Sequence, residues 1–380
     1  WLKAAPLPLP GMVPGTAISQ GTRPPSWPWP RGQPHTLLLL LVFPVRLAFG
    51  RSVPNHTVSG VSAGGDMAVN HFVVFSGSVL GVGVVAGAPY GCNVVEGTGD
   101  VCGSMAEGAP WRWLLWRMAV HMRLRAALGL IDPLENLRGR RVYLFSGQAD
   151  WVVQRPVMEA VRWQLGNLTG GDTVKADFDV NATHGWVVDG QLCGPAGSGP
   201  QGAECARCCC EPAALLACEG YDLAGRLLSH LLGRQPAASR IWAPIEDLLA
   251  VPQAPYVPRG RTLDDVGLWH TAYICAPKRC RHANAQCAVH VHYHGCVWGA
   301  EYEGTSVIRR LGFLEWAEAG SIVMVFPQAS STVDPMGCWD WTGKTSHFFD
   351  THRGPQLATV FSLLSDLPNI LGMRAQSILI

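Results

Sequence analysis

Short apolar runs alternate with longer segments of helical periodicity along most of the chain. Strands are predicted where apolar and β-branched residues cluster between glycines or polar turns, at 57–59, 79–86, 141–145, 174–180, 290–293 and 322–326. Helices are predicted at 66–75, 111–128, 156–165, 223–232, 305–319 and 357–367, and the second of these has the pattern of an amphipathic helix. This alternation predicts an α/β fold with a mostly parallel central sheet and helices on both faces.

The ends and two internal stretches depart from this pattern. Residues 1–50 are rich in proline, and their apolar run at 37–43 has the length of a signal-peptide core, so we expect a leader there. Residues 51–380 are expected to form a single domain. Within it, 193–218 has the composition of a cysteine-rich insertion and 234–262 that of a proline-rich surface linker.

Charge and apolar run length exclude two kinds of partner. Only 15% of the residues are charged and the formal net charge is +1, which argues against a nucleic-acid surface. No apolar run approaches the roughly 18–20 residues that span a bilayer, so no stable membrane insertion is expected.

Cysteine usage indicates an oxidising compartment. The chain has 13 cysteines, more than a reduced cytosolic enzyme normally carries, and the odd number leaves one thiol free or paired between chains. Proximity in sequence suggests the pairs Cys92–Cys102 and Cys280–Cys287. N-glycosylation sequons begin at Asn55, Asn167 and Asn181. Together these signals predict a secreted glycoprotein.

The segment Gly60-Val61-Ser62-Ala63-Gly64 has the form of a nucleophile elbow. It lies between a predicted strand and a predicted helix, where a tight turn flanked by small residues presents a serine hydroxyl at the sheet edge. Read alone, the same pattern is also compatible with a plain glycine-rich turn.

Two residues downstream complete a candidate triad. Asp150 follows a strand and a Ser-Gly turn, and His184 follows the next strand. Each has an ordinary alternative, since Asp150 suits a helix cap and His184 a surface loop. The order Ser, Asp, His at successive strand ends is the order of α/β-hydrolases, which favours catalysis.

A tract of histidines and cysteines at 275–296 has two further interpretations. Alternation puts His290, His292 and His294 on one strand face, which suits a metal, but the spacing matches no zinc pattern and disulfides account for the cysteines. We therefore predict no metal. The His294-Gly295-Cys296 turn instead suits an oxyanion hole. It lies more than 200 residues after Ser62, which requires a permuted fold if this interpretation holds.

The chain resembles the extracellular poly(3-hydroxybutyrate) depolymerases, in particular the fungal-type, circularly permuted, single-domain serine esterases. The matching segments are 58–68 (VSGVSAGGDMA), 81–92 (GVGVVAGAPYGC), 142–153 (VYLFSGQADWVV), 221–225 (YDLAG), 290–296 (HVHYHGC), 326–329 (FPQA) and 337–341 (GCWDW). They occur in family order over most of residues 53–365.

The resemblance implies a role for each candidate residue. Ser62 becomes the nucleophile, Asp150 the orienting acid and His184 the general base, and the oxyanion hole is formed by the backbone N–H groups of Ala63 and Cys296. The implied substrate is a polyester or a small ester, the protein is expected to be a monomer, and the chemistry needs no cofactor.

Substrate contacts are expected from tryptophans. Trp186 stands where the family tends to have another residue and is predicted to shape the acyl pocket. Trp298 and Trp339 are candidates for contact with a polymer surface, with burial in the core as the alternative. Asp66 also departs from the small or aromatic residues usual in the nucleophile segment.

Two other functions stay open. A feruloyl or acetyl-xylan-type esterase would use the same triad on plant-wall esters. A secreted binding protein that kept the fold without turnover is the alternative outside enzymes, and the intact Ser62, Asp150 and His184 argue against it.

Overall fold

The computed structural model describes residues 53–96, 102, 111–189, 206–207, 215–218, 220–234, 248–282 and 285–372. The predicted leader at 1–50 lies outside these residues, as does most of the 193–218 insertion. No helix among the described residues is long and apolar enough to cross a bilayer.

An eight-stranded sheet forms the centre of the fold, in the order β4-β3-β2-β1-β10-β11-β9-β8. All its pairings from β4 to β11 are parallel, whereas β9 runs antiparallel to both β11 and β8. The strands are β1 His56–Val61, β2 Val79–Val85, β3 Arg141–Phe145, β4 Val174–Asp177, β8 Leu248–Pro252, β9 Thr271–Cys275, β10 Ala288–Tyr293 and β11 Ile322–Phe326. The mostly parallel α/β sheet is thereby confirmed. Because β10 pairs with β1, segments far apart in the chain become neighbours, as a permuted fold requires.

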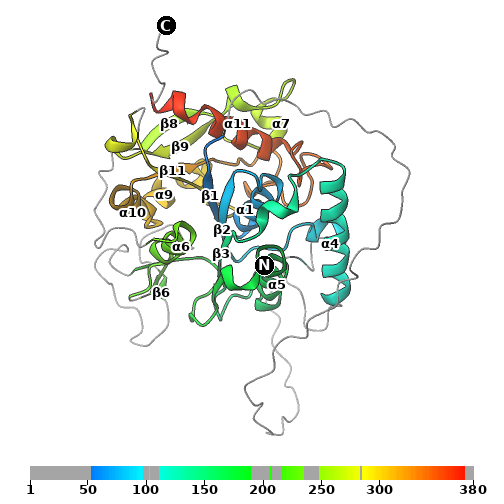
Figure 1. Cartoon of the computed structure of the whole chain (residues 1–380). Helices are drawn as coiled ribbons and strands as arrows, with labels where there is room; N and C mark the ends of the chain where they lie inside the picture. Colours follow the sequence, from blue (N-terminus) through cyan, green and yellow to red (C-terminus); the bar gives the residue numbers. More distant parts are fainter. Residues whose placement is uncertain are drawn as a thin grey trace, which may run out of the picture. The chain divides into compact units, whose positions relative to one another are not determined.

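Helices cover both faces of this sheet (Figure 1). The longer ones are α1 Ala63–Val74, α4 Trp111–Ala127, α5 Arg155–Thr169, α6 Leu223–Leu232, α10 Phe313–Gly320 and α11 Pro355–Ile370. The short ones are α2 Cys92–Glu96, α7 Leu263–Val266, α8 Ala300–Glu303 and α9 Ser306–Arg310, with 3-10 turns at η1 Leu134–Leu137, η2 Gly171–Thr173, η5 Ala254–Tyr256 and η6 Lys278–Cys280.

Alternation along the strands divides the core into two apolar clusters. In β3, Val142 and Leu144 belong to the cluster that includes residues of α1, α4, α5 and α11. Tyr143 and Phe145 belong to the other cluster, which includes residues of α6 and α10. Both faces of the sheet are therefore buried, as parallel sheets require.

Several segments differ from the sequence prediction, among them strand β9, which was missed, and the strand expected at 174–180, which ends at Asp177. The helix expected at 305–319 is broken into α9 and α10 by Gly312, whose φ of +83° is a left-handed conformation that ends a helix. Part of the supposed linker at 234–262 is the edge strand β8, which pairs with β9. A small sheet was also missed, formed by β5 Trp186–Asp189, β6 Ala206–Arg207 and β7 Leu215–Cys218.

Disulfides tie loops to this framework. The two pairs suggested by sequence proximity, Cys92–Cys102 and Cys280–Cys287, are confirmed. A third bond, Cys296–Cys338, joins the turn after β10 to a loop 42 residues later.

Candidate active site

The turn between β1 and α1 holds Ser62 in a strained conformation. Its φ is +57° and its ψ is −128°, a region that a residue with a side chain rarely adopts. The turn closes so tightly that a Cβ added at Gly60 would lie 1.9 Å from the carbonyl oxygen of Gly64. Position 60 requires glycine for this reason, and position 64 requires it because a Cβ there would lie 2.3 Å from the Tyr293 carbonyl oxygen. The serine side chain stands at the carboxyl end of the strand.

Asp150 and His184 are in direct contact at the same sheet edge. The Oδ2 atom of Asp150 lies 2.9 Å from Nδ1 of His184. The other carboxylate oxygen accepts the backbone N–H groups of Val152 and Val153, each at 2.9 Å, which fixes the orientation of the acid. An ionised Asp150 requires the proton on Nδ1 of His184, so Nε2 is left as the basic nitrogen.

Backbone hydrogen bonds align the loops that carry the three residues. The Ser62 N–H donates to Val85 O at 2.9 Å, at the end of β2. The Ala86 N–H in turn donates to Phe145 O at 3.1 Å, at the end of β3. The elbow and the loop with Asp150 therefore share one edge. Among the hydrogen bonds of the described residues, none joins the Ser62 hydroxyl to His184, and such contacts are often long without substrate.

The turn after β10 lies beside Ser62. A Cβ added at Gly295 would lie 3.5 Å from Cβ of Ser62, and one added at Gly64 would lie 2.3 Å from the His294 carbonyl oxygen. The first turn of α1 and the end of β10 are thus in backbone contact. This places Cys296 close to Ala63, the first residue of α1, where N–H groups have no partner within the helix.

A single buried imidazole holds this turn. Nδ1 of His294 lies 2.7 Å from Gly295 O, and Nε2 accepts the Ala329 N–H at 3.1 Å. One nitrogen therefore donates and the other accepts, which only a neutral ring can do. Burial lowers the pKa of His294 to about 4. We identify His294 as a structural residue of the turn.

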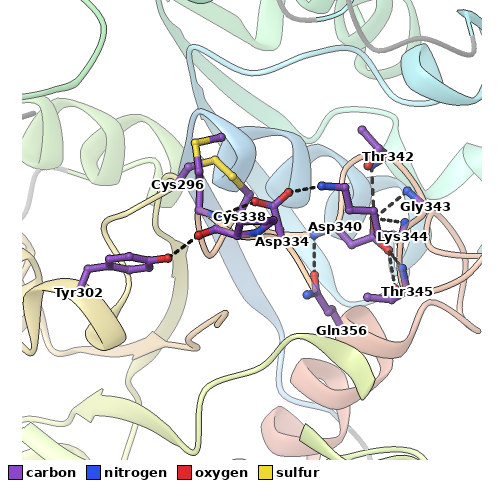
Figure 2. A network of polar contacts seen from close by, with 12 residues as sticks. Cys296, Tyr302, Asp334, Cys338, Asp340, Thr342, Gly343, Lys344, Thr345 and Gln356 are labelled. Atoms are coloured by element: carbon purple, nitrogen blue, oxygen red, sulfur yellow. Dashed lines mark hydrogen bonds and ion pairs between the residues drawn. A yellow bond between two sulfur atoms is a disulfide. The ribbon is translucent and has the colours of Figure 1, made fainter. Parts of the chain in front are cut away.

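A second loop clamps the turn from the other side (Figure 2). Besides the Cys296–Cys338 disulfide, the Val297 N–H donates to Met336 O at 2.7 Å. The Asp340 carboxylate in turn accepts backbone N–H groups of residues 342–345, including Gly343 at 2.7 Å. We call residues 334–345 the clamp loop. Because the Cys296–Cys338 disulfide joins this loop to Cys296, the fixed conformation of the loop restrains the position of Cys296.

The other histidines of the tract form a polar seam between strands. The Nδ1 and Nε2 atoms of His290 lie 2.7 Å from the hydroxyls of Thr57 and Ser59, respectively, and Ser59 also contacts Nδ1 of His292 at 2.9 Å. Burial lowers the pKa of His290 to about 3, so its ring is neutral. These contacts tie β10 to β1. Within the described residues, no three His, Cys, Asp or Glu side chains are arranged to hold a metal ion.

Comparison with known proteins finds relatives that match most of the chain. The chain is 32% identical over 315 residues to a poly(3-hydroxybutyrate) depolymerase of Delftia acidovorans, covering 81% of the chain and 58% of that relative. It is 26% identical to a polyhydroxybutyrate depolymerase of Talaromyces funiculosus, covering 82% of the chain and 89% of that protein. The chain is therefore similar to poly(3-hydroxybutyrate) depolymerases over about four fifths of its length. No protein-family model matches it.

Solved structures agree with that similarity. A PHB depolymerase from Penicillium funiculosum superposes with a TM-score of 0.66, and a serine-to-alanine PHB depolymerase variant complexed with an R3HB trimer superposes with 0.67. Both are 25% identical to the chain and cover 83% of it and 96% of their own length. The chain spans only 58% of the length of the Delftia relative, so that protein contains sequence with no counterpart here.

The tryptophans expected at a depolymerase substrate site are buried. Trp186 and Trp339 have no exposed surface and Trp298 is 8% exposed. The Trp186 indole N–H donates to Leu311 O at 2.9 Å, inside the second apolar cluster. For Trp298 and Trp339 the structure agrees with the alternative of burial. The prediction that Trp298 and Trp339 contact a polymer surface is therefore wrong, because buried side chains cannot reach one.

Exposed apolar side chains do occur beside the candidate triad. Trp151, next to Asp150, is 75% exposed, and Val297 and Met336 flank Cys296 with 43% and 55% exposed. Sequence reasoning missed all three, although adjacency to Asp150 and Cys296 was a usable signal for Trp151 and Val297.

Asp66 lines a small polar cavity behind the elbow. Its carboxylate accepts the Ala88 N–H, and the cavity is also lined by Asn70, Asn93 and Trp341. Burial raises the pKa of Asp66 to about 7. This departure from the usual family residue therefore adds a carboxyl group that titrates near neutral pH, one helical turn after Ser62.

Proposed function

We propose that the chain is a serine esterase that hydrolyses poly(3-hydroxybutyrate) or related short-chain hydroxyalkanoate polyesters and oligomers. The observation that carries the proposal is the Asp150–His184 hydrogen bond of 2.9 Å at the sheet edge where Ser62 occupies a strained elbow. A strained serine beside an oriented imidazole is the arrangement that acyl transfer needs. The family supplies the substrate class.

In the proposed mechanism, Nε2 of His184 removes the hydroxyl proton as Oγ of Ser62 attacks the ester carbonyl. The ionised Asp150 stabilises the imidazolium that forms. The carbonyl oxygen becomes an oxyanion, which the N–H groups of Ala63 and Cys296 are proposed to bind. Transfer of the proton to the leaving alkoxide releases the alcohol and leaves an acyl-enzyme.

Deacylation reverses these roles with water. His184 removes a proton from the incoming water, the hydroxide attacks the acyl carbonyl, and the same proton returns to Oγ of Ser62. The products are a free carboxylic acid and the regenerated serine. All proton transfers in the two half-reactions pass through one imidazole, so the loss of its orientation slows both.

The decisive experiment compares the wild type with Ser62→Ala on a short p-nitrophenyl ester and on a poly(3-hydroxybutyrate) suspension. Hydrolysis of both by the wild type alone supports the full proposal. Hydrolysis of the soluble ester alone supports the triad but indicates that the substrate is a smaller ester, such as a feruloyl or acetyl ester. Folded wild type without Ser62-dependent activity on either substrate contradicts enzymatic function and favours a binding protein.

We further propose that the enzyme is a secreted, glycosylated monomer. Three disulfides form among the described residues, and such bonds persist in oxidising compartments. The acceptor residues Asn55, Asn167 and Asn181 are all exposed. Mass spectrometry before and after glycosidase treatment tests the glycans, and light scattering coupled to gel filtration tests the monomer.

A further inference from the structure

Helix α4 carries a continuous apolar stripe on its solvent-facing side. The members of this stripe are Trp113, Trp116, Val120, Leu124 and, directly after the helix, Leu128, which are 53%, 62%, 43%, 56% and 63% exposed. Their spacing of three, four, four and four residues keeps them on one helical face. The Leu128 N–H donates to Leu124 O, which continues the helical turn. At 1.5 Å per residue the α4 stripe is about 22 Å long.

The stripe is not part of the core. The opposite face of α4 supplies the buried side chains, including Leu114, Met118 and Met122. The helix is therefore anchored without help from the stripe, and the stripe leaves large apolar groups in water. Exposed apolar surface arranged in this way marks an interaction site.

The polar side chains of α4 restrict the kind of partner. They are four arginines and one histidine, and the helix has no Asp, Glu, Asn, Gln, Ser or Thr. Arg125 and His121 contact the buried Asp350, so they face inward. The Arg117 guanidinium lies 4.6 Å from the Trp113 ring centroid and edges the stripe. The outer face thus combines apolar groups with N–H donors and offers no carboxylate or amide acceptor.

The tryptophan end of the stripe points toward the catalytic edge of the sheet. Beyond the C-terminal end of α4, the Asp132 carboxylate accepts the Gly77 N–H at 2.8 Å, just before β2 begins. Midway along α4, His121 lies against Gly91, in the segment that follows the end of β2. The helix therefore runs antiparallel to β2. Trp113 and Trp116 lie toward the end where Ser62 and Asp150 are found.

We propose that the α4 stripe is a docking surface for solid polyester, and this inference rests on the proposed function. A short-chain polyester surface presents methyl and methylene groups together with ester carbonyls, which only accept hydrogen bonds. The stripe supplies the complement, with apolar rings and chains plus indole and guanidinium donors. Docking through it would hold the enzyme on the polymer surface, with the Trp113 end of the stripe toward the catalytic edge.

The test uses the inactive Ser62→Ala protein, so that binding is measured without hydrolysis. Its depletion from solution by poly(3-hydroxybutyrate) granules is compared with that of the same protein carrying Trp113→Ala and Trp116→Ala. Because each indole removes a large apolar area from water on contact, the partition coefficient should fall by at least about tenfold. The control is Trp163→Ala, which removes a 50% exposed tryptophan from α5 and should change binding less than about twofold.

The same tryptophan changes in active protein separate docking from catalysis. With Ser62 intact, hydrolysis of the soluble ester should match the wild type, while clearing of the granules should fall with the partition coefficient. Unchanged granule binding overturns the proposal, as does an equal loss in the Trp163→Ala control. The proposal is also overturned if the two tryptophan changes abolish binding to anionic phospholipid vesicles and leave granule binding intact. That result would identify a membrane as the surface that the stripe binds. Inactivity of the wild type on soluble ester contradicts the proposed function, a result distinct from any of these.

Discussion

Removing the Cys296–Cys338 disulfide is the most direct test of the clamp loop. In Cys338→Ala the bond is lost while the backbone N–H of Cys296 remains. The bond closes a loop of 42 residues, and the chain-entropy relation assigns such a closure about 4 kcal/mol of stability. If the clamp positions an oxyanion donor, kcat should also fall by about 10- to 100-fold. This is less than the 10²–10³ seen when such a donor is deleted, because the Val297–Met336 hydrogen bond still holds the turn.

The matched control is Cys280→Ala. It breaks a disulfide of seven-residue separation that lies away from the candidate triad, at an entropic cost of about 2.4 kcal/mol. Both variants are assayed on a soluble p-nitrophenyl ester about 10 °C below their own unfolding midpoints, with folding checked by circular dichroism. The KM of Cys338→Ala should stay within about twofold, since an oxyanion contact forms mainly in the transition state. A kcat of Cys338→Ala within about threefold of the wild type would refute the idea that the clamp loop positions an oxyanion donor. An equal loss of kcat in Cys280→Ala would refute it as well.

Three further predictions concern titratable groups. Asp150→Asn should lower kcat by about 10³–10⁴ at an unchanged fold, because an amide no longer fixes the tautomer of the catalytic base, and a loss below about tenfold would contradict the triad. Asp66 holds its proton to a pH of about 7 in the folded state but ionises near pH 4 when unfolded, so it opposes folding progressively as pH rises between these values. Asp66→Asn should therefore raise the free energy of unfolding by up to about 4 kcal/mol at pH 8 and by much less at pH 4.5. Equal urea midpoints for the wild type and the variant at pH 8 would contradict this prediction. His56, His290 and His294 stay neutral when folded, with pKa values of about 4, 3 and 4, but take protons below pH 6.5 when unfolded. The free energy of unfolding is therefore unaffected by these histidines above pH 6.5 and falls on acidification by about 4 kcal/mol per pH unit for the three together. Urea unfolding of the Asp66→Asn variant measures this fall. A free energy of unfolding that stays constant from pH 6.5 to 5 would contradict burial of the three histidines in the neutral form.

The features that sequence predicted are those set by local pattern. The strand at 141–145 and the helix at 223–232 have the predicted bounds, because apolar runs and periodicity act within a few residues. The candidate triad was also found locally, since the elbow needs glycines two positions from Ser62 and loops at strand ends carry the other two residues.

What sequence missed depends on contacts between distant segments. Strand β8 was assigned to a linker because its prolines mask an edge position, which only pairing with β9 reveals. The amphipathic pattern predicted for α4 was wrong, because apolar residues occupy both of its faces. Periodicity could not tell the faces apart, since Leu114 and Trp113 are both apolar while one is buried and the other exposed. The clamp loop could not be predicted for the same reason. Asp340 makes its hydrogen bonds within its own loop, and the Cys296–Cys338 disulfide connects that loop to the candidate site.

The candidate site also depends on one junction that no local motif describes. Gly64 packs directly on the end of β10, and the seam of His290 with Thr57 and Ser59 binds the same two strands further back. The spacing between Ser62 and the Cys296 N–H is therefore set by backbone contact and strand register instead of by mobile side chains. A methyl group at position 64 would lie 2.3 Å from the His294 carbonyl oxygen and would have to separate the elbow from the oxyanion turn. The permuted order of the strands is thus tolerated because sheet pairing, and not chain continuity, joins the nucleophile to the groups proposed to stabilise its transition state.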